Sequence, residues 1–228
     1  MVRVAEIVVV VPVLGRPQNA QPLADSLAAS TDRVHLLFVC SPGDSAQIEA
    51  CRATGADTLI TSWKPGPADF ARKINLGYHE SSEPFVFQGA DDLEFTPGWA
   101  DAALTAIEGF MVCGTNDDAN PAVRSGRHST HTLFRRSYLD DPGASMDGPG
   151  TVFSTAYDHQ WCDNEAVAVA QARGVWTFAF GAVVRHRHPI WRTAPMDSTY
   201  AKGLARGVED HAVFLDRRHL WETERVAS

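Results

Sequence analysis

The first 95 residues alternate short apolar runs with helix-like segments, and this order constrains the fold more than any other feature of the chain. Four apolar runs are expected to be strands: residues 7–11, 34–40, 57–61 and 84–87. Helices are expected between them, over residues 18–30, 45–55 and 69–82. This order predicts an α/β fold with a Rossmann-like, mostly parallel sheet and flanking helices, which binds ligands at the carboxyl ends of its strands.

The second half of the chain is less regular. We expect helices from about residue 97, over 156–173 and over 204–215, with strands at 110–114 and 175–184. Residues 114–152 are rich in Gly, Pro, Asn and Asp, and only 131–136 is typical of a strand, so mobile loops are expected there. We therefore expect a single domain with two unequal halves, residues 1–114 and an irregular 115–228.

Composition excludes several classes of function. A chain of 228 residues that is 44% hydrophobic can bury one sizeable core. Its net charge of −8 gives no broad basic surface for bulk nucleic acid or for a membrane. The longest apolar run, residues 7–14, contains a proline and is too short to span a bilayer. We expect a soluble protein with no membrane span.

The four cysteines also bear on location. Cys40, Cys51, Cys113 and Cys162 form no C-x-x-C pair, and we interpret them as free thiols, mostly buried. Free thiols favour a reducing compartment, so a cytoplasmic location is expected.

Three acids, Asp91, Asp92 and Glu94, are crowded where the strand at 84–87 ends, in the stretch "GADDLEF". Carboxylates at a buried strand end repel one another, and hard oxygen ligands suit Mg²⁺ or Mn²⁺. The alternative is a solvated acidic turn in front of the helix that starts near Pro97. The chain has no G-x-G-x-x-G after its first strand and no G-x-x-x-x-G-K, which argues against dinucleotide and P-loop sites.

Five stretches together carry a resemblance to a known family. They are "VVVVPVLGRPQNAQPLADSLAAS", "ARKINLGY", "GADDLEFTPGW", "HQWCDNEAVAVAQARG" and "AVVRHRHP". In this order they resemble the nucleotide-sugar glycosyltransferases of the GT-A fold, in the family 2 style. The resemblance covers most of residues 5–190, but nothing matches in 115–150. One departure is Gly89, which stands where the family's D-x-D-D motif often has its first acid.

The resemblance implies a metal-dependent, inverting glycosyltransferase that uses Mn²⁺ or Mg²⁺. The donor is expected to be a nucleotide diphosphate sugar, with UDP-sugars favoured, and the acceptor hydroxyl is unknown. Residues 1–114 would bind the donor, and residues 115–228 would bind the acceptor. Two alternatives stay open. A nucleotidyltransferase of related fold is poorly matched by the single glycine and arginine in "PVLGRPQ". A non-catalytic nucleotide-sugar-binding relative would be compatible with the missing first acid.

The matching positions imply roles for individual residues. Asp163 matches the general base that deprotonates the acceptor hydroxyl. The implied metal residues are Asp91, Asp92 and His186. The implied nucleotide-binding residues are Pro12, Leu14, Arg16, Ser41, Asp44, Arg72, Asn75 and Asp91. Glu94 is a candidate to compensate for the missing first acid.

Periodicity adds expectations about direction. Asp163 and Glu165 lie about 200° apart on a regular helix, so Glu165 is expected on the far face. His186 and His188 alternate along a strand, so only His186 is expected to reach a site, which disfavours zinc bound by "HRH". A pair formed by His128 and His131 lacks a third zinc ligand.

Three aromatic residues are candidates for stacking on a sugar face: Tyr157, Trp161 and Trp191. At least one of the two tryptophans is expected to belong to the core instead.

Overall fold

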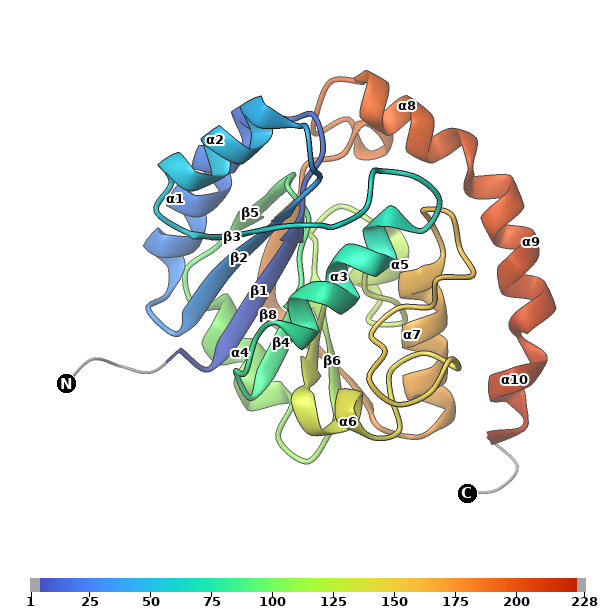
Figure 1. Ribbon diagram of the computed structural model, residues 1–228. Coiled ribbons are helices and arrows are strands. Elements are labelled where there is room, and N and C mark those ends of the chain that lie inside the picture. Colours follow the sequence, from blue (N-terminus) through green and yellow to red (C-terminus); the bar gives the residue numbers. More distant parts are fainter. Residues whose placement is uncertain (1–4, 225–228) are drawn as a thin grey trace.

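The computed structural model describes residues 5–224, which are built around an eight-stranded sheet of order β3-β2-β1-β4-β7-β6-β8-β5 (Figure 1). The strands are β1 (Ile7–Pro12), β2 (Val34–Cys40), β3 (Asp57–Ile60), β4 (Phe85–Gln88), β5 (Leu93–Phe95), β6 (Val112–Asn116), β7 (Thr132–Arg135) and β8 (Trp176–His186). Strands β1 to β4 pair in parallel, as do β6 and β8. Strand β7 is antiparallel to both β4 and β6, so β6 and β8 run in the direction of the first four. The predicted mostly parallel α/β fold is confirmed.

Helices cover both faces of this sheet. They are α1 (Ala20–Ser30), α2 (Ser45–Ala53), α3 (Asp69–His79), α4 (Trp99–Ala106), α5 (Pro121–Arg124), α6 (Arg136–Asp140), α7 (Cys162–Ala172), α8 (Ser198–Ala205), α9 (Gly207–Arg217) and α10 (His219–Glu222). The core clusters place α1, α2 and α4 on one face, and α3, α6 and α7 on the other (Figure 1). No helix among residues 5–224 combines the length and the apolar character that crossing a bilayer requires.

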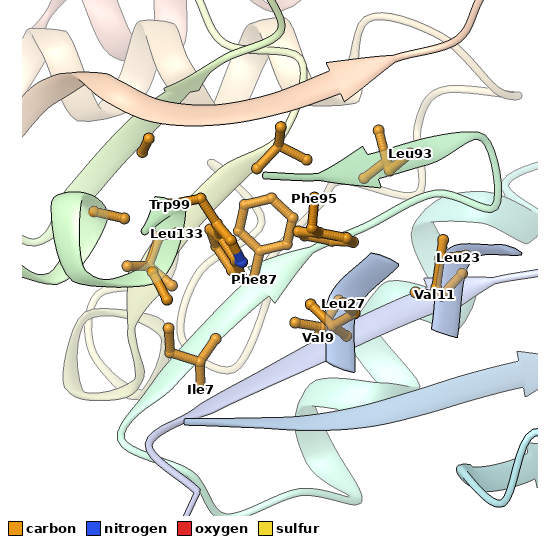
Figure 2. Close-up of a cluster of buried hydrophobic side chains, with 14 of the residues drawn as sticks. Ile7, Val9, Val11, Leu23, Leu27, Phe87, Leu93, Phe95, Trp99 and Leu133 are labelled. Atoms are coloured by element: carbon orange, nitrogen blue, oxygen red, sulfur yellow. The ribbon is translucent and has the colours of Figure 1, made fainter. Parts of the chain in front are cut away.

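Strand β1 is buried on both faces, because its β-branched residues alternate between the two core clusters. Val9 and its odd-numbered neighbours face α1 and α4, whereas Val8 and Val10 face α3. On the first face, Trp99 packs against Phe87 and Phe95 with ring centroids 4.9 and 5.0 Å apart (Figure 2). The continuous apolar run at the N-terminus is therefore the centre of the sheet.

The "ARKINLGY" helix lies unusually close to β1, and Gly77 permits this approach. A Cβ atom at Gly77 would lie 2.3 Å from Cγ1 of Val10. Asn75 receives hydrogen bonds from the backbone amides of Val152 and Phe153 and donates one to the Phe153 carbonyl. Two residues of the motif thus serve packing, since they fasten α3 to the sheet and to a distant loop.

Several predicted boundaries in the second half are wrong. The helix expected over 156–173 begins only at Cys162, because residues 158–160 donate their backbone amides to the Asp210 carboxylate instead of forming a helical turn. The helix expected from about residue 97 is confirmed, since α4 begins at Trp99. Residues 114–152 hold the short helices α5 and α6 as well as β7, and the short strand β5 had not been predicted at all.

The C-terminal helix expected over 204–215 is divided into α8, α9 and α10, of which α9 and α10 pack beside α7 (Figure 1). Two buried acids fasten this helical segment. Asp210 accepts the three backbone hydrogen bonds just described. Glu165 of α7 accepts two hydrogen bonds from Arg217 of α9. The C-terminal helices are thereby joined to the helix that carries Asp163.

Candidate active site

A cavity of about 1120 Å³ opens at the carboxyl edge of the sheet. The ends of β1, β4 and β8 contribute Pro12, Gln88 and His186 to its wall. The first turn of α7 contributes Asp163, and α8 contributes Tyr200. This is the edge at which ligands bind in parallel α/β sheets, as the element order predicted.

The paired acids after β4 meet an arginine from the loop after β1. Asp91 and Asp92 are only 10% and 8% exposed, and Arg16 is equally enclosed. The Arg16 Nη1 atom lies 3.0 Å from Asp91 Oδ1 and 3.8 Å from Asp92 Oδ2. Arg16 therefore supplies positive charge to both acids.

The start of α8 completes this charged cluster. Asp197 forms an ion pair with the Arg16 guanidinium, with 3.0 Å between its Oδ2 and Nε. The Tyr200 ring lies under the same guanidinium, 3.7 Å from its central carbon, and the Tyr200 hydroxyl donates to Asp92 Oδ2 at 2.9 Å. The C-terminal segment thus contacts the acids and their arginine directly.

The two acids titrate very differently. Burial raises the pKa of Asp91 to about 7, with the negative charge of Asp92 adding to the effect and Arg16 opposing it. Burial acts against ionisation of Asp92 too, but the charge and hydrogen bond of His186 outweigh it and hold the pKa of Asp92 well below its usual range. The pair therefore shares less than two full negative charges at neutral pH, as expected for crowded carboxylates.

Three histidines surround Asp92. His186 Nε2 lies 3.3 Å from Asp92 Oδ2, and its ring lies 4.9 Å from that of His131 and 5.0 Å from that of His188. Burial lowers the pKa of His131 to about 3, and burial together with the His186 charge lowers that of His188 to about 4. The prediction that His188 points away from His186 is wrong, because β8 ends at His186 and strand alternation stops there.

The acid cluster fits a divalent cation that a ligand helps to hold. Asp92 Oδ1 is buried and makes no hydrogen bond, so one carboxylate oxygen is free to accept a cation. Within residues 5–224, no group of three or more His, Cys, Asp or Glu side chains is arranged to bind a metal by itself. Mg²⁺ is usually bound by one or two carboxylates, with phosphate oxygens and water completing its shell. Asp91 and Asp92 match that incomplete arrangement.

Neither neighbour of the pair supplies a further acid. A Cβ atom at Gly89 would lie 3.0 Å from the carbonyl oxygen of Val10, so this position has no room for an acidic side chain without a shift of β1. Glu94 forms ion pairs with Arg185 and Arg187 and does not line the cavity. The idea that Glu94 compensates for the missing first acid is therefore wrong.

Asp163, in the first turn of α7, also lines the cavity. Its side chain is 20% exposed, and burial nevertheless raises its pKa above the usual value, while the nearby His128 acts in the opposite direction. His128 Nε2 lies 3.7 Å from Asp163 Oδ2. Glu165 is fully buried on the other side of α7, where Tyr157 donates a hydrogen bond to it. The expected separation of Asp163 and Glu165 is confirmed.

The expected nucleotide-binding residues fall into two groups. Pro12, Leu14, Arg16 and Asp91 line the cavity, whereas Ser41, Asp44, Arg72 and Asn75 do not. Asp44 accepts a hydrogen bond from the Gly15 amide at 2.8 Å, so it shapes the loop after β1. The Arg72 guanidinium lies over the Trp63 ring, away from the acids.

Lys73 reaches the cavity where Arg72 had been expected. It is 1% exposed and donates to the Val13 carbonyl and to the Ser41 hydroxyl, at 2.9 and 2.7 Å. Its ammonium group also forms an ion pair with Asp69 at 2.8 Å. The resemblance favoured Arg72, but it is the adjacent Lys73 on the same helix that lines the cavity.

The aromatic candidates also separate. Tyr157 is 1% exposed and belongs to the core, so it cannot stack on a sugar. Trp161 and Trp191 both line the cavity, although Trp161 also stacks on His211 of α9. All four cysteines are buried and free, as expected.

Sequence reasoning did not single out Tyr200, which lines the cavity, or Asp197, which pairs with Arg16, and it considered His128 only as half of a zinc pair. His128 lies in the stretch without family resemblance, and Asp197 and Tyr200 lie beyond its end. Asp197 is the N-cap of α8 and accepts hydrogen bonds from the backbone amides of Thr199 and Tyr200, but the predicted helix over 204–215 starts too late to reveal this role.

Comparison with known proteins supports the fold. No protein-family model and no curated protein matches the sequence. The mannosyltransferase PcManGT from Pyrobaculum calidifontis, solved with GDP-Man and Mn²⁺, superposes with a TM-score of 0.64 at 14% identity, covering 91% of this chain and 62% of its own. For TarS of S. aureus the TM-score is 0.58 at 15% identity, with coverage of 78% of this chain and 36% of TarS.

A third match is glucosyl-3-phosphoglycerate synthase from Mycobacterium tuberculosis, solved with Mn²⁺, UDP and glucosyl-3-phosphoglycerate. Its TM-score is 0.55 at 14% identity, and the match covers 90% of this chain and 80% of that one. The chain thus spans less than two thirds of the length of the first two matched structures. At these identities the similarity is one of fold, and the chain has the GT-A fold of nucleotide-sugar glycosyltransferases.

Proposed function

We propose that the protein is a glycosyltransferase that moves a sugar from a nucleotide diphosphate sugar to an acceptor hydroxyl, with a divalent cation, Mn²⁺ or Mg²⁺, at Asp91 and Asp92. The observation that carries the proposal is that this crowded acid pair and Asp163 line one cavity at the carboxyl edge of a GT-A sheet. The matched structures with GDP-Man or UDP and Mn²⁺ support the same donor class.

The donor is expected to lie between the loop after β1 and the acids. Pro12 and Leu14 line the cavity there, and Lys73 fixes the loop through the Val13 carbonyl. His186 and Arg16 place positive charge beside the acids. A divalent cation at Asp91 and Asp92 would supply further positive charge to the departing diphosphate. We favour a UDP-sugar as donor.

The acceptor reacts beside Asp163. The Asp163 carboxylate takes the proton of the acceptor hydroxyl as its oxygen bonds to the anomeric carbon, and the bond from that carbon to the diphosphate oxygen breaks. The diphosphate leaves with the electron pair of the broken bond. We expect inversion of the anomeric configuration, as the resemblance to family 2 glycosyltransferases implies. A carboxylate whose pKa is raised by burial is a stronger base than an ordinary aspartate, which suits this role.

Isothermal titration of nucleoside diphosphates tests donor binding, first with Mn²⁺ and then with EDTA. One nucleotide is expected to bind with metal, and Asp91→Ala should abolish this binding. Glu94→Gln is the matched control, since this nearby acid points away from the cavity and its loss should leave binding unchanged. Absence of nucleotide binding under both conditions would contradict the proposal.

Turnover then separates this proposal from its alternatives. Asp163→Asn should keep donor binding but lower the transfer rate by about 10²- to 10⁴-fold, the usual contribution of a general base. A nucleotidyltransferase would not need this residue, and a non-catalytic binding protein would show no transfer in either form. Equal rates for the variant and the wild type would refute the assignment of Asp163.

A further inference from the structure

His128 and Asp163 lie close together in the lining of the cavity. The two side chains are 16% and 20% exposed, and both line the cavity. Among residues 5–224, no other side chain lies within ion-pairing or hydrogen-bonding distance of the Asp163 carboxylate, and His128 Nε2 is 3.7 Å from Oδ2. The imidazole is therefore the nearest polar partner of the expected base.

The loop that carries His128 is fixed on both sides of this residue. Ser129 is fully buried, receives the Thr115 amide on its hydroxyl oxygen and donates to the His131 carbonyl at 2.6 Å. On the other side, Gln171 of α7 donates to the Arg127 carbonyl at 2.9 Å. One of the two anchors thus belongs to α7, the helix that carries Asp163. These hydrogen bonds fix the backbone on both sides of His128 and so hold its side chain next to Asp163.

The charges around Asp163 give the pairing a consequence. Burial is the largest effect and raises the pKa of Asp163; the positive charge of His128 is the largest opposing effect, followed by backbone amides at the start of α7 and by His186. The other titratable groups that interact with this carboxylate are His159 and the Cys162 thiol. The exposed Arg127 adjoins His128 in the same loop.

We propose that His128 is a positioning residue for the reaction at Asp163: its imidazole pairs with the carboxylate and orients it toward the acceptor hydroxyl. This role rests on the proposed glycosyltransferase function. The separation of 3.7 Å is longer than a hydrogen bond, and catalytic hydrogen bonds are often long before the substrate binds and shorten in the complex. Without His128, the buried Asp163 would hold its proton to higher pH and would be free to turn.

The test needs a readout that does not depend on turnover. Carboxyl ¹³C resonances are followed against pH in full-length protein labelled at aspartate, and the Asp163 resonance is assigned by its loss in Asp163→Asn. In His128→Gln the Asp163 titration should shift to higher pH. In His128→Lys, which restores a positive charge, it should shift back toward the wild-type position. His219→Gln, a histidine of α10 outside the cavity, is the control and should cause no shift.

Kinetics complete the test. The acidic limb of the pH profile of kcat/KM should move to higher pH in His128→Gln and return in His128→Lys, with nucleotide affinity unchanged in both. An Asp163 titration that is the same in His128→Gln and wild type would overturn the pairing, whether or not the protein transfers sugar. A wild-type protein that binds no nucleotide sugar would instead overturn the proposed function, and the titration would still decide whether His128 and Asp163 interact.

Discussion

The Glu165–Arg217 ion pair is expected to be a main support of the C-terminal helices, and its removal gives a strong stability prediction. Glu165 is fully buried in α7, and Arg217 of α9 contacts both of its carboxylate oxygens, with Nε at 2.7 Å and Nη2 at 2.9 Å. The Tyr157 hydroxyl and the Met146 amide make the remaining two hydrogen bonds. In Arg217→Met the carboxylate stays buried but loses its counter-charge.

The expected loss follows from these contacts. Breaking a buried ion pair by removing one partner usually costs about 3–5 kcal/mol, because an uncompensated charge remains. The two surviving hydrogen bonds to Glu165 reduce this cost, so we expect a loss near the lower end, about 3 kcal/mol in the free energy of unfolding. For a chain of this size that corresponds to a fall in Tm of roughly 6–12 °C.

A neighbouring arginine provides the control. Arg218 is exposed and forms an ion pair with Glu222 one helical turn away, so Arg218→Met should cost no more than about 0.5 kcal/mol. Urea unfolding of both variants, followed by circular dichroism, makes the comparison. Equal losses in the two variants would refute the reasoning that burial of Glu165 makes its ion pair valuable. The Glu165→Gln and Arg217→Met double-mutant cycle would then give the coupling energy directly.

Two further predictions concern other parts of the molecule. Gly77→Ala should lower the free energy of unfolding by about 1–3 kcal/mol, because its methyl group would overlap Val10 of β1; a loss below 0.5 kcal/mol in urea unfolding would mean that α3 can move away at little cost. Arg16→Gln should bind Mn²⁺ more tightly in the absence of nucleotide, since no guanidinium then competes for Asp91, and unchanged affinity in isothermal titration would show that the ion pair does not oppose the metal.

The regular half of the fold was predictable because its signals are local. The β-branched residues of β1 are buried on both faces, and the strand run 7–11 differs from the observed Ile7–Pro12 by one residue. A strand of this kind has few other ways to bury its side chains. The position of the acid pair at the carboxyl edge followed from strand order alone, without knowledge of any side-chain contact.

The second half was harder because tertiary contacts override local pattern there. Residues 158–160 lie in a segment with helical composition, yet their amides are taken by Asp210, which is about 50 residues away in sequence. His186 and His188 follow the spacing of a strand, but the strand ends at His186, and the two rings lie 5.0 Å apart on the same side. Neither the capture of these amides by Asp210 nor the end of the strand can be recognised from the few residues around it in the sequence.

The acid pair illustrates the same limit at the level of chemistry. Two adjacent carboxylates in a buried turn predict a positively charged partner. From the sequence alone a metal ion is favoured, because the basic side chains that contact the acids, Arg16 and His186, are distant along the chain. Arg16 is 75 residues from Asp91, and Tyr200 is 108 residues from Asp92. Burying both acids without such partners would cost several kcal/mol of desolvation. The protein avoids that cost by bringing the loop after β1 and the start of α8 onto the acids, so the C-terminal helices that Glu165 and Arg217 hold in place are part of the candidate site and not an appendage to it.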